Sequence, residues 1–185
     1  MRRRHLLPTC WLFTDERMGD ALWTALARLP RGGGIVFRHY SLPRTERRAL
    51  FERLRAIARR QKLALLLAGP IRDAIGWRAD GVHGKGRHIV PRHLLATSPA
   101  HNRREIIAAR RAGRDALFLS PVFVTRSHPG ARVLGATRFG LFAAHAGMPV
   151  IALGGMDNAG LRRLGKAVAG YAAIDAWTKS DQIRT

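Results

Sequence analysis

Acidic residues, cysteine and long apolar runs are scarce in this sequence of 185 residues. Asp and Glu number 12 against 33 Lys and Arg, so the formal net charge is +21. The single cysteine, Cys10, excludes an intrachain disulfide and fits a reducing compartment. No apolar run approaches the roughly 20 residues needed to cross a bilayer, and the apolar start of the chain contains Pro8 and leads into Asp15. We therefore expect a cytoplasmic protein without a membrane span.

The positive charge is almost entirely arginine, because lysine occurs only at positions 62, 85, 166 and 179. Such a surface attracts polyanions, whether the protein binds RNA, acts on phosphorylated substrates or only shares a basic composition with its proteome. The arginine pairs fall on the outer faces of predicted helices, and the tryptophans are too scattered to form a stacking platform for single-stranded nucleic acid. Nucleic-acid binding is therefore the least favoured hypothesis.

Short apolar runs alternate with helical patterns along the whole chain. The predicted strands are 10–14, 34–38, 63–68, 81–83, 94–98, 116–120, 150–153 and 171–174, and the predicted helices are 20–29, 44–61, 102–112, 136–146 and 158–164. Strand and helix in regular succession predict parallel strands joined by crossovers. Eight such strands favour one (β/α)₈ TIM-barrel domain over residues 1–185, with an open doubly wound sheet as the alternative.

The chain is short for a TIM barrel, so parts of the barrel must be trimmed. The fourth connection, 84–93, has little helical periodicity, and too few residues follow Ile174 for a full eighth helix. A strand without its helix exposes apolar surface, which usually finds a partner. We therefore predict a homodimer whose interface includes Trp177 and the arginine-rich amino terminus. The alternative is a monomer in which residues 1–8 cover the gap.

The seventh predicted strand ends at Gly154 and Gly155, just before a predicted helix. Glycines at the end of a parallel strand leave backbone N–H groups uncovered, which is how a phosphate is held. Phosphate sites in TIM barrels often lie after strands seven and eight. The equally weighted alternative is a tight turn that needs glycine for its backbone angles.

Six segments, in order along the chain, resemble the thiamine-phosphate synthase family, including its TenI-type thiazole tautomerase branch. They are LFTD (12–15), VFRHY (36–40), ADGVHGKG (79–86), SPAH (98–101), RAGRDALFLSPVFVTRSHPG (111–130) and PVIALGGM (149–156). The resemblance implies a (β/α)₈ barrel that binds a small thiazole phosphate at Gly154 and Gly155.

The synthase branch, as the resemblance implies, joins that thiazole to a pyrimidine diphosphate with magnesium, but its magnesium and diphosphate residues differ here. The arginine of its Gln-Leu-Arg-Glu-Lys segment is retained as Arg38, whereas its lysine is lost. Its Asn-Asp pair falls on Ala68 and Gly69, its Gln-Glu-Asp on residues 86–88, and a loop lysine on His128. Because magnesium prefers oxygen ligands, it is expected only if synthase chemistry is retained.

The tautomerase branch needs a phosphate anchor and one group that moves a proton, for which histidine is suited near neutral pH. The resemblance places its acid–base histidine at His101, although Ser98-Pro99-Ala100-His101 holds one residue more than the family's Ser-x-His pattern. The alternative is a solvent-facing His101 at the start of a helix. The other substrate-site candidates are Arg38, Ser98, Thr125 and His128. Asp175 falls where the family has a serine beside the phosphate, and a carboxylate there would repel the anion.

His83, His88 and His93 recur every five residues without a recognised zinc spacing, so we predict no metal site among them. Lys85 and Arg87 could instead bind an anion, with their positive charge in place of that of the lost magnesium. The favoured function is therefore a tautomerase or a divergent synthase that binds thiazole phosphate. The alternative is a non-catalytic relative that binds the ligand only.

Overall fold

The computed structural model describes residues 7–86, 88–125, 130, 132–165, 168–174 and 177 of the chain. Its strands are β1 (Cys10–Phe13), β2 (Gly34–Phe37), β3 (Ala64–Ala68), β4 (Gly81–His83), β5 (Leu95–Ala100), β6 (Ala116–Leu119), β7 (Val150–Leu153) and β8 (Gly170–Ala173). Its helices are η1 (Glu16–Met18), α1 (Ala21–Arg28), α2 (Arg44–Gln61), α3 (Ile71–Gly76), α4 (Arg103–Arg111), α5 (Gly135–Ala144) and α6 (Asn158–Leu164). The predicted strands are all present. The short α3 lies where no helix is predicted, because six residues span less than two helical turns.

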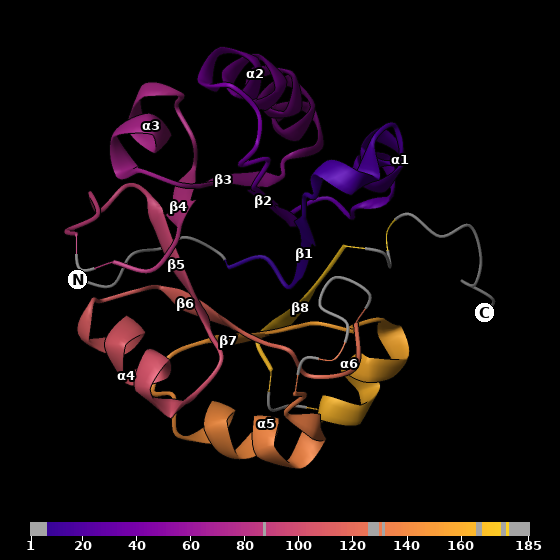
Figure 1. The fold of residues 1–185 in the computed structure, drawn as a ribbon, viewed down its shortest axis with the longest axis vertical. Coiled ribbons are helices and arrows are strands. Elements are labelled where there is room, and N and C mark those ends of the chain that lie inside the picture. The colour runs from indigo at the N-terminus through magenta and orange to yellow at the C-terminus, as the bar shows by residue number, and fades with distance from the viewer. Residues whose placement is uncertain are drawn as a thin grey trace.

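The eight strands form a closed barrel in chain order, and the helices surround it as an outer ring (Figure 1). All neighbouring strands are parallel, and β8 pairs with β1 through the register Trp11↔Ala172. This last pairing closes the sheet, so the open doubly wound alternative is excluded. The predicted (β/α)₈ barrel is confirmed.

Large inward-facing side chains fill the barrel. Trp11 and Phe13 of β1 meet Phe118 of β6 edge to face, with ring centroids 5.2 and 4.8 Å apart. Gly34 makes room for Trp11, since a Cβ at this position would lie 2.3 Å from the indole ring. Burying a side chain such as Phe118 contributes about 2–3 kcal/mol of transfer free energy. Because the interior is packed, a ligand can lie only beyond the strand ends.

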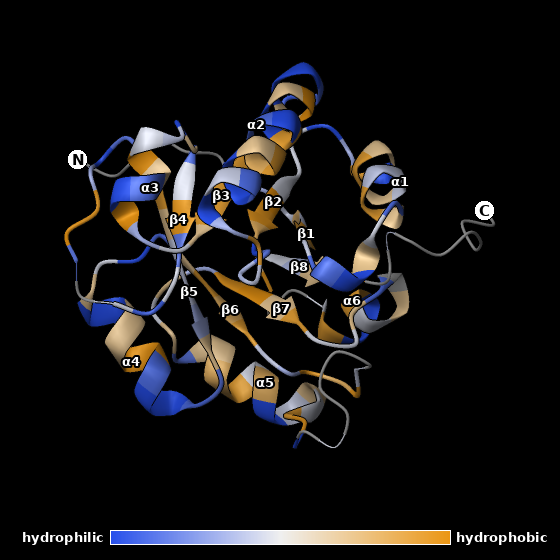
Figure 2. Cartoon of the chain, turned by 45° about the horizontal axis from the view of Figure 1, so that its top comes forward, coloured by the Kyte–Doolittle hydropathy of each residue, from blue (hydrophilic) through white to orange (hydrophobic). Residues whose placement is uncertain are grey.

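Apolar side chains also join the strands to the helices. Figure 2 shows apolar strands at the centre and helices with polar residues on their outer sides. In α2, for example, Phe51, Leu54 and Ala58 are buried against the barrel, whereas the arginines at 48, 53 and 60 are exposed. The helical face predicted for 44–61 therefore packs inward.

Two sectors of the ring lack a covering helix among the described residues. One is the fourth connection, between β4 and β5, which contains no helical residue over 84–86 and 88–94. Figure 1 shows this sector between α3 and α4. The other follows β8, where most of the remaining chain lies outside the described residues.

Trp177 packs onto its own barrel in the second sector. Its indole Nε1–H donates a hydrogen bond to the carbonyl of Trp11 at 3.1 Å, and its ring stacks on Tyr171 with centroids 5.8 Å apart. Leu7, by contrast, packs against the interior cluster of the barrel, and residues 1–6 lie outside the described part of the chain. Trp177 thus covers part of the outer side of β1 and β8. Among the described residues, no helix has the length and apolarity to cross a membrane.

Candidate functional site

Polar side chains gather where the strands end. Four buried polar side chains end a strand or follow one closely at its carboxyl end, namely Thr14, His39, His83 and Ser120, and a fifth, Thr97, lies within β5. The carboxyl ends of the parallel strands form one rim of the barrel, which is where TIM barrels hold their reactive groups. This rim is the candidate active site.

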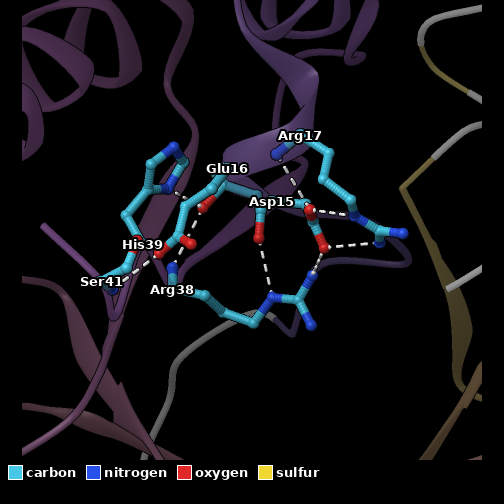
Figure 3. A network of polar contacts seen from close by, with 7 residues as sticks. Asp15, Glu16, Arg17, Arg38, His39 and Ser41 are labelled. Carbon is cyan, nitrogen blue, oxygen red and sulfur yellow. Dashed lines mark hydrogen bonds and ion pairs between the residues drawn. The ribbon is translucent and has the colours of Figure 1, made fainter. Parts of the chain in front are cut away.

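An ion-pair network joins the ends of β1 and β2 (Figure 3). Asp15 accepts from Arg17 Nε at 2.7 Å and from Arg38 Nη2 at 2.8 Å. Arg38 also donates through Nε to the carbonyl of Thr14 at 2.7 Å. The hydrogen bond from Arg17, with the charge of Arg38, lowers the pKa of Asp15 to about 2. Asp15 is therefore an anion that orients Arg38 at the rim.

His39 and Arg47 fix the backbone beside Arg38. The Nδ1 of His39 lies 3.0 Å from the Thr14 hydroxyl, and its ring stacks on Phe37 at 4.9 Å. Burial lowers the pKa of His39 and favours the neutral ring. Arg47 donates to the carbonyls of Arg38 and Ala68 at 2.6 and 2.7 Å, which ties the end of β2 to the end of β3.

His83, at the end of β4, is a neutral histidine inside the rim. Its Nδ1 lies 2.9 Å from the hydroxyl of Thr97, which donates onward to a backbone carbonyl at 3.5 Å. The imidazole therefore donates through Nδ1 and keeps the Nε2 lone pair. Burial, reinforced by the charges of Arg38 and Arg114, lowers the pKa of His83 to about 3. The ring is held edge-on between Phe13 and Phe118, at 5.3 and 5.2 Å.

His101 follows β5 and has a defined tautomer. Its Nδ1 lies 2.8 Å from the carbonyl oxygen of Ser120 at the end of β6. A carbonyl only accepts, so Nδ1 carries the proton and a neutral ring exposes Nε2 as a base. The backbone N–H of His101 donates to Glu105, which also accepts from Lys85 Nζ at 2.7 Å. His101 is therefore oriented from both sides while its side chain remains open to solvent.

The double glycine after β7 packs closely against the segment that follows β6. Both Gly154 and Gly155 have positive φ angles, 92° and 62°. A Cβ on Gly154 would lie 2.9 Å from the Cα of Pro121, and one on Gly155 would lie 2.4 Å from the carbonyl oxygen of Val124. Conformation and close packing thus explain both glycines without a ligand. Asp157 caps α6 by accepting a hydrogen bond from the backbone N–H of Gly160 at 2.7 Å. Because this carboxylate already occupies the start of the helix, an anion would have to bind the N–H groups of the glycine turn itself.

The remaining predicted site residues are placed differently. Ser98 pairs with Leu117, which packs in an outer cluster, and so faces the helices and not the rim. Thr125 is half-buried in the segment after β6. His128, Asp175 and Arg87 lie outside the described residues. The structure therefore brings Arg38, His101 and the glycine pair to one rim and directs Ser98 away from it.

The rim does not fit magnesium. No group of three or more His, Cys, Asp or Glu side chains converges within the described ranges. The nearest carboxylates already have cationic partners: Asp15 binds Arg17 and Arg38, and Glu105 binds Lys85. Ala68 and Gly69, where the resemblance implies metal ligands, have no side-chain oxygen. Magnesium prefers several free oxygen ligands, which these side chains do not supply.

Sequence reasoning did not assign a role to His83, Thr97, Glu105 or Ser120. His83 could have been singled out as a histidine that ends a buried strand, but its pairing with Thr97 depends on which strands are neighbours. Glu105 is signalled by Asn102, because Asn followed three residues later by Glu is typical of a helix start. Asn102 indeed accepts from the Glu105 N–H at 3.0 Å.

Comparisons with known proteins agree with this architecture. A family model described as thiamine monophosphate synthase matches residues 10–176. A thiamine-phosphate synthase of Chloroflexus aurantiacus is 29% identical over 82% of this chain and 76% of its own length. A putative thiamine-phosphate synthase 2 of Aquifex aeolicus is 28% identical over 81% and 86%. The solved thiamine phosphate pyrophosphorylase of Pyrococcus furiosus superposes with a TM-score of 0.76 at 24% identity, covering 94% of this chain and 88% of that one. The chain belongs to the thiamine monophosphate synthase family.

Proposed function

We propose that this protein binds a thiazole phosphate and shifts a proton on its ring, as a TenI-like tautomerase. The observation that carries the proposal is the position of His101 relative to the glycine turn. His101 Nδ1 contacts the carbonyl of Ser120, and Phe123 N donates to the carbonyl of Gly154 at 3.0 Å. One short segment, 120–123, therefore contacts both the candidate base and the candidate phosphate site.

The spacing of these two groups suits a small phosphorylated ring. They follow β5 and β7, which flank β6. Two strand spacings place the ends of β5 and β7 about 10 Å apart. A ligand with its phosphate at Gly154 and Gly155 can thus present its ring towards His101. The net positive charge of the chain favours the approach of such an anion.

The proton shift follows from the tautomer of His101. Nε2 takes a proton from one ring atom of the thiazole, and the imidazolium returns a proton to another ring atom. The reaction is an isomerisation, so no other reactant is consumed. The Ser120 carbonyl, 2.8 Å from Nδ1, stabilises the transient imidazolium by accepting its hydrogen bond. A positioned general base of this kind contributes about 10²–10⁴-fold to the rate.

The test combines proton exchange with amide shifts. In D₂O, the protein should catalyse incorporation of deuterium into a thiazole phosphate, and His101→Ala should reduce the rate at least about 100-fold. His93→Ala, which removes an exposed histidine of the fourth connection, should leave it unchanged. The amide cross-peaks of Gly154 and Gly155 should shift on titration with the ligand. Exchange that survives in His101→Ala would overturn the assignment of the base.

Two other functions have specific support. Arg38 is retained at the rim, which favours a divergent synthase; turnover of thiazole phosphate with pyrimidine diphosphate at about 1 per second or more would establish it. Packing alone accounts for both glycines of the turn, which supports a relative that binds the ligand without catalysing a reaction. Such a protein would bind thiazole phosphate but show no exchange. We further propose a homodimer in the reducing cytoplasm, on the basis of the partly covered β8 side and the single Cys10.

A further inference from the structure

Glu105, the third residue of α4, contacts the candidate base through its carboxylate. One carboxylate oxygen, Oε2, accepts from the backbone N–H of His101 at 2.8 Å, and the other, Oε1, accepts from Lys85 Nζ at 2.7 Å. The backbone N–H of Glu105 donates to the side chain of Asn102, the residue that caps the helix, at 3.0 Å. Three segments therefore meet at this one side chain: the β4–β5 connection, the end of β5 and the start of α4.

The position of this carboxylate departs from the usual arrangement at a helix start. In a capping box, the glutamate at the third helical position accepts from the backbone N–H of the capping residue itself. Here the cap is Asn102, yet the carboxylate of Glu105 accepts from the residue before it, His101. The side chain of Asn102 caps the helix without help from this carboxylate. The second half of the box therefore acts on the candidate base instead of on the helix.

Glu105 is an anion near neutral pH and is only partly open to water. Its side chain is 26% exposed, against 56% for that of Lys85. Burial alone would raise the pKa of this carboxyl, but the hydrogen bonds from Lys85 and from the His101 backbone lower it. Because the acceptor is charged, the bond from the His101 N–H is stronger than one between neutral groups. The exposed ion pair with Lys85 contributes little free energy and serves to hold the carboxylate in place.

The backbone position of His101 decides what its ring can reach. His101 directly follows Ala100, the last residue of β5, whose carbonyl accepts from the Ser120 N–H at 3.0 Å. The ring reaches the same residue, with Nδ1 2.8 Å from the carbonyl oxygen of Ser120. A backbone shift of about 1 Å away from Ser120 would lengthen this contact beyond hydrogen-bonding distance. Loss of the contact would free the ring to adopt the other tautomer, in which Nε2 carries the proton and is no longer a base.

We propose that Glu105 is a positioning residue for His101. Its carboxylate holds the His101 backbone, so that Nδ1 donates to the Ser120 carbonyl and an unprotonated Nε2 is presented at the rim. Glu105 acts through His101 and has no contact with the ligand of its own. The inference rests on the proposed function for the reaction that His101 performs, whereas the tautomer of the ring tests the inference separately.

Nitrogen NMR of the His101 ring at about pH 8, where histidine is ordinarily neutral, tests the proposal without turnover. Wild type should show a protonated Nδ1 and an unprotonated Nε2. Glu105→Ala should show a mixture of both tautomers, whereas Glu105→Gln, which keeps an oxygen acceptor for the His101 N–H, should restore the wild-type pattern. Glu46→Ala is the matched control, because Glu46 is likewise the third residue of its helix, α2, and is exposed. Thermal unfolding establishes that each variant is folded.

Deuterium exchange into a thiazole phosphate gives the second measurement. Glu105→Ala should lower kcat about tenfold and leave KM unchanged, since one charge-assisted hydrogen bond that orients the base is lost. Glu105→Gln should recover most of this rate, and Glu46→Ala should match wild type. A raised KM with an unchanged kcat would place Glu105 in ligand binding and overturn the proposal.

The tautomer separates this inference from the proposed function. A wild-type ring with its proton on Nε2, or an unchanged tautomer in folded Glu105→Ala, would overturn the positioning role whether or not exchange occurs. An equal change in Glu46→Ala would also overturn it, as would a loss of stability in Glu105→Ala with tautomer and kcat unchanged, since Glu105 would then only stabilise the helix. A tautomer change in Glu105→Ala together with no exchange by wild type would support the positioning role and count against the proposed function.

Discussion

Replacing Asp15 with asparagine tests the ion-pair network at the rim through its pH dependence. The hydrogen bond from Arg17 lowers the pKa of Asp15 from its ordinary value of 3.8 to about 2. At 1.36 kcal/mol per pH unit, that fall corresponds to about 2.4 kcal/mol. The Arg17 side chain is 61% exposed, so solvent screens this contribution. We expect Asp15→Asn to lower the free energy of unfolding by about 1 kcal/mol near pH 6.

The pH dependence of this destabilisation follows from the lowered pKa of Asp15. A carboxylate whose pKa is lower in the folded state stabilises the fold above its unfolded pKa and loses that effect as the pH falls. The difference between wild type and Asp15→Asn should therefore shrink between about pH 4 and pH 2. Urea unfolding at several pH values measures it, with Asp20→Asn as control, since Asp20 makes no capping hydrogen bond. A difference that is constant across this range, or equal for both variants, would refute the reasoning.

Three further outcomes follow from the described contacts. Arg47→Met should lower the free energy of unfolding measured in urea by about 2 kcal/mol, because the carbonyls of Arg38 and Ala68 lose their donor. An unchanged free energy of unfolding would show that water replaces the guanidinium as donor. Trp177→Ala should lower the free energy of unfolding by about 2 kcal/mol, because the hydrogen bond to Trp11 and the stacking on Tyr171 are lost. Light scattering tests the homodimer, and a monomeric mass that does not change on dilution would contradict it. Saturating magnesium should leave the unfolding temperature unchanged, and a rise would reveal a metal site.

The barrel could be predicted because its strands are apolar runs with clear ends. Val150–Leu153 stops at a double glycine, and Gly34–Phe37 follows a glycine run. The end of β5 was harder to predict. Pro99 lacks an N–H, which predicts that the strand stops before it, yet β5 continues in register to Ala100.

The site could be predicted only in part, for the same geometric reason. Arg38 and His101 directly follow strands, so their place at the rim follows from the fold alone. The pairs Thr14–His39 and Thr97–His83 join neighbouring strands, and their partners lie 25 and 14 positions apart in the sequence. Spacing along the chain does not reveal such pairs, because they depend on the register between strands. The packing that requires glycine after β7 likewise depends on the loop after β6.

The shortness of β4 also has a consequence for local opening of the barrel. β4 has three residues, and the described part of its connection to β5 contributes no helix to shield it. Local unfolding is easiest where few buried contacts must be broken. Amide hydrogens of β4 should therefore exchange with solvent faster than those of the longer strands β3 (Ala64–Ala68) and β5 (Leu95–Ala100). The barrel wall would then open first beside His83, at the end of β4.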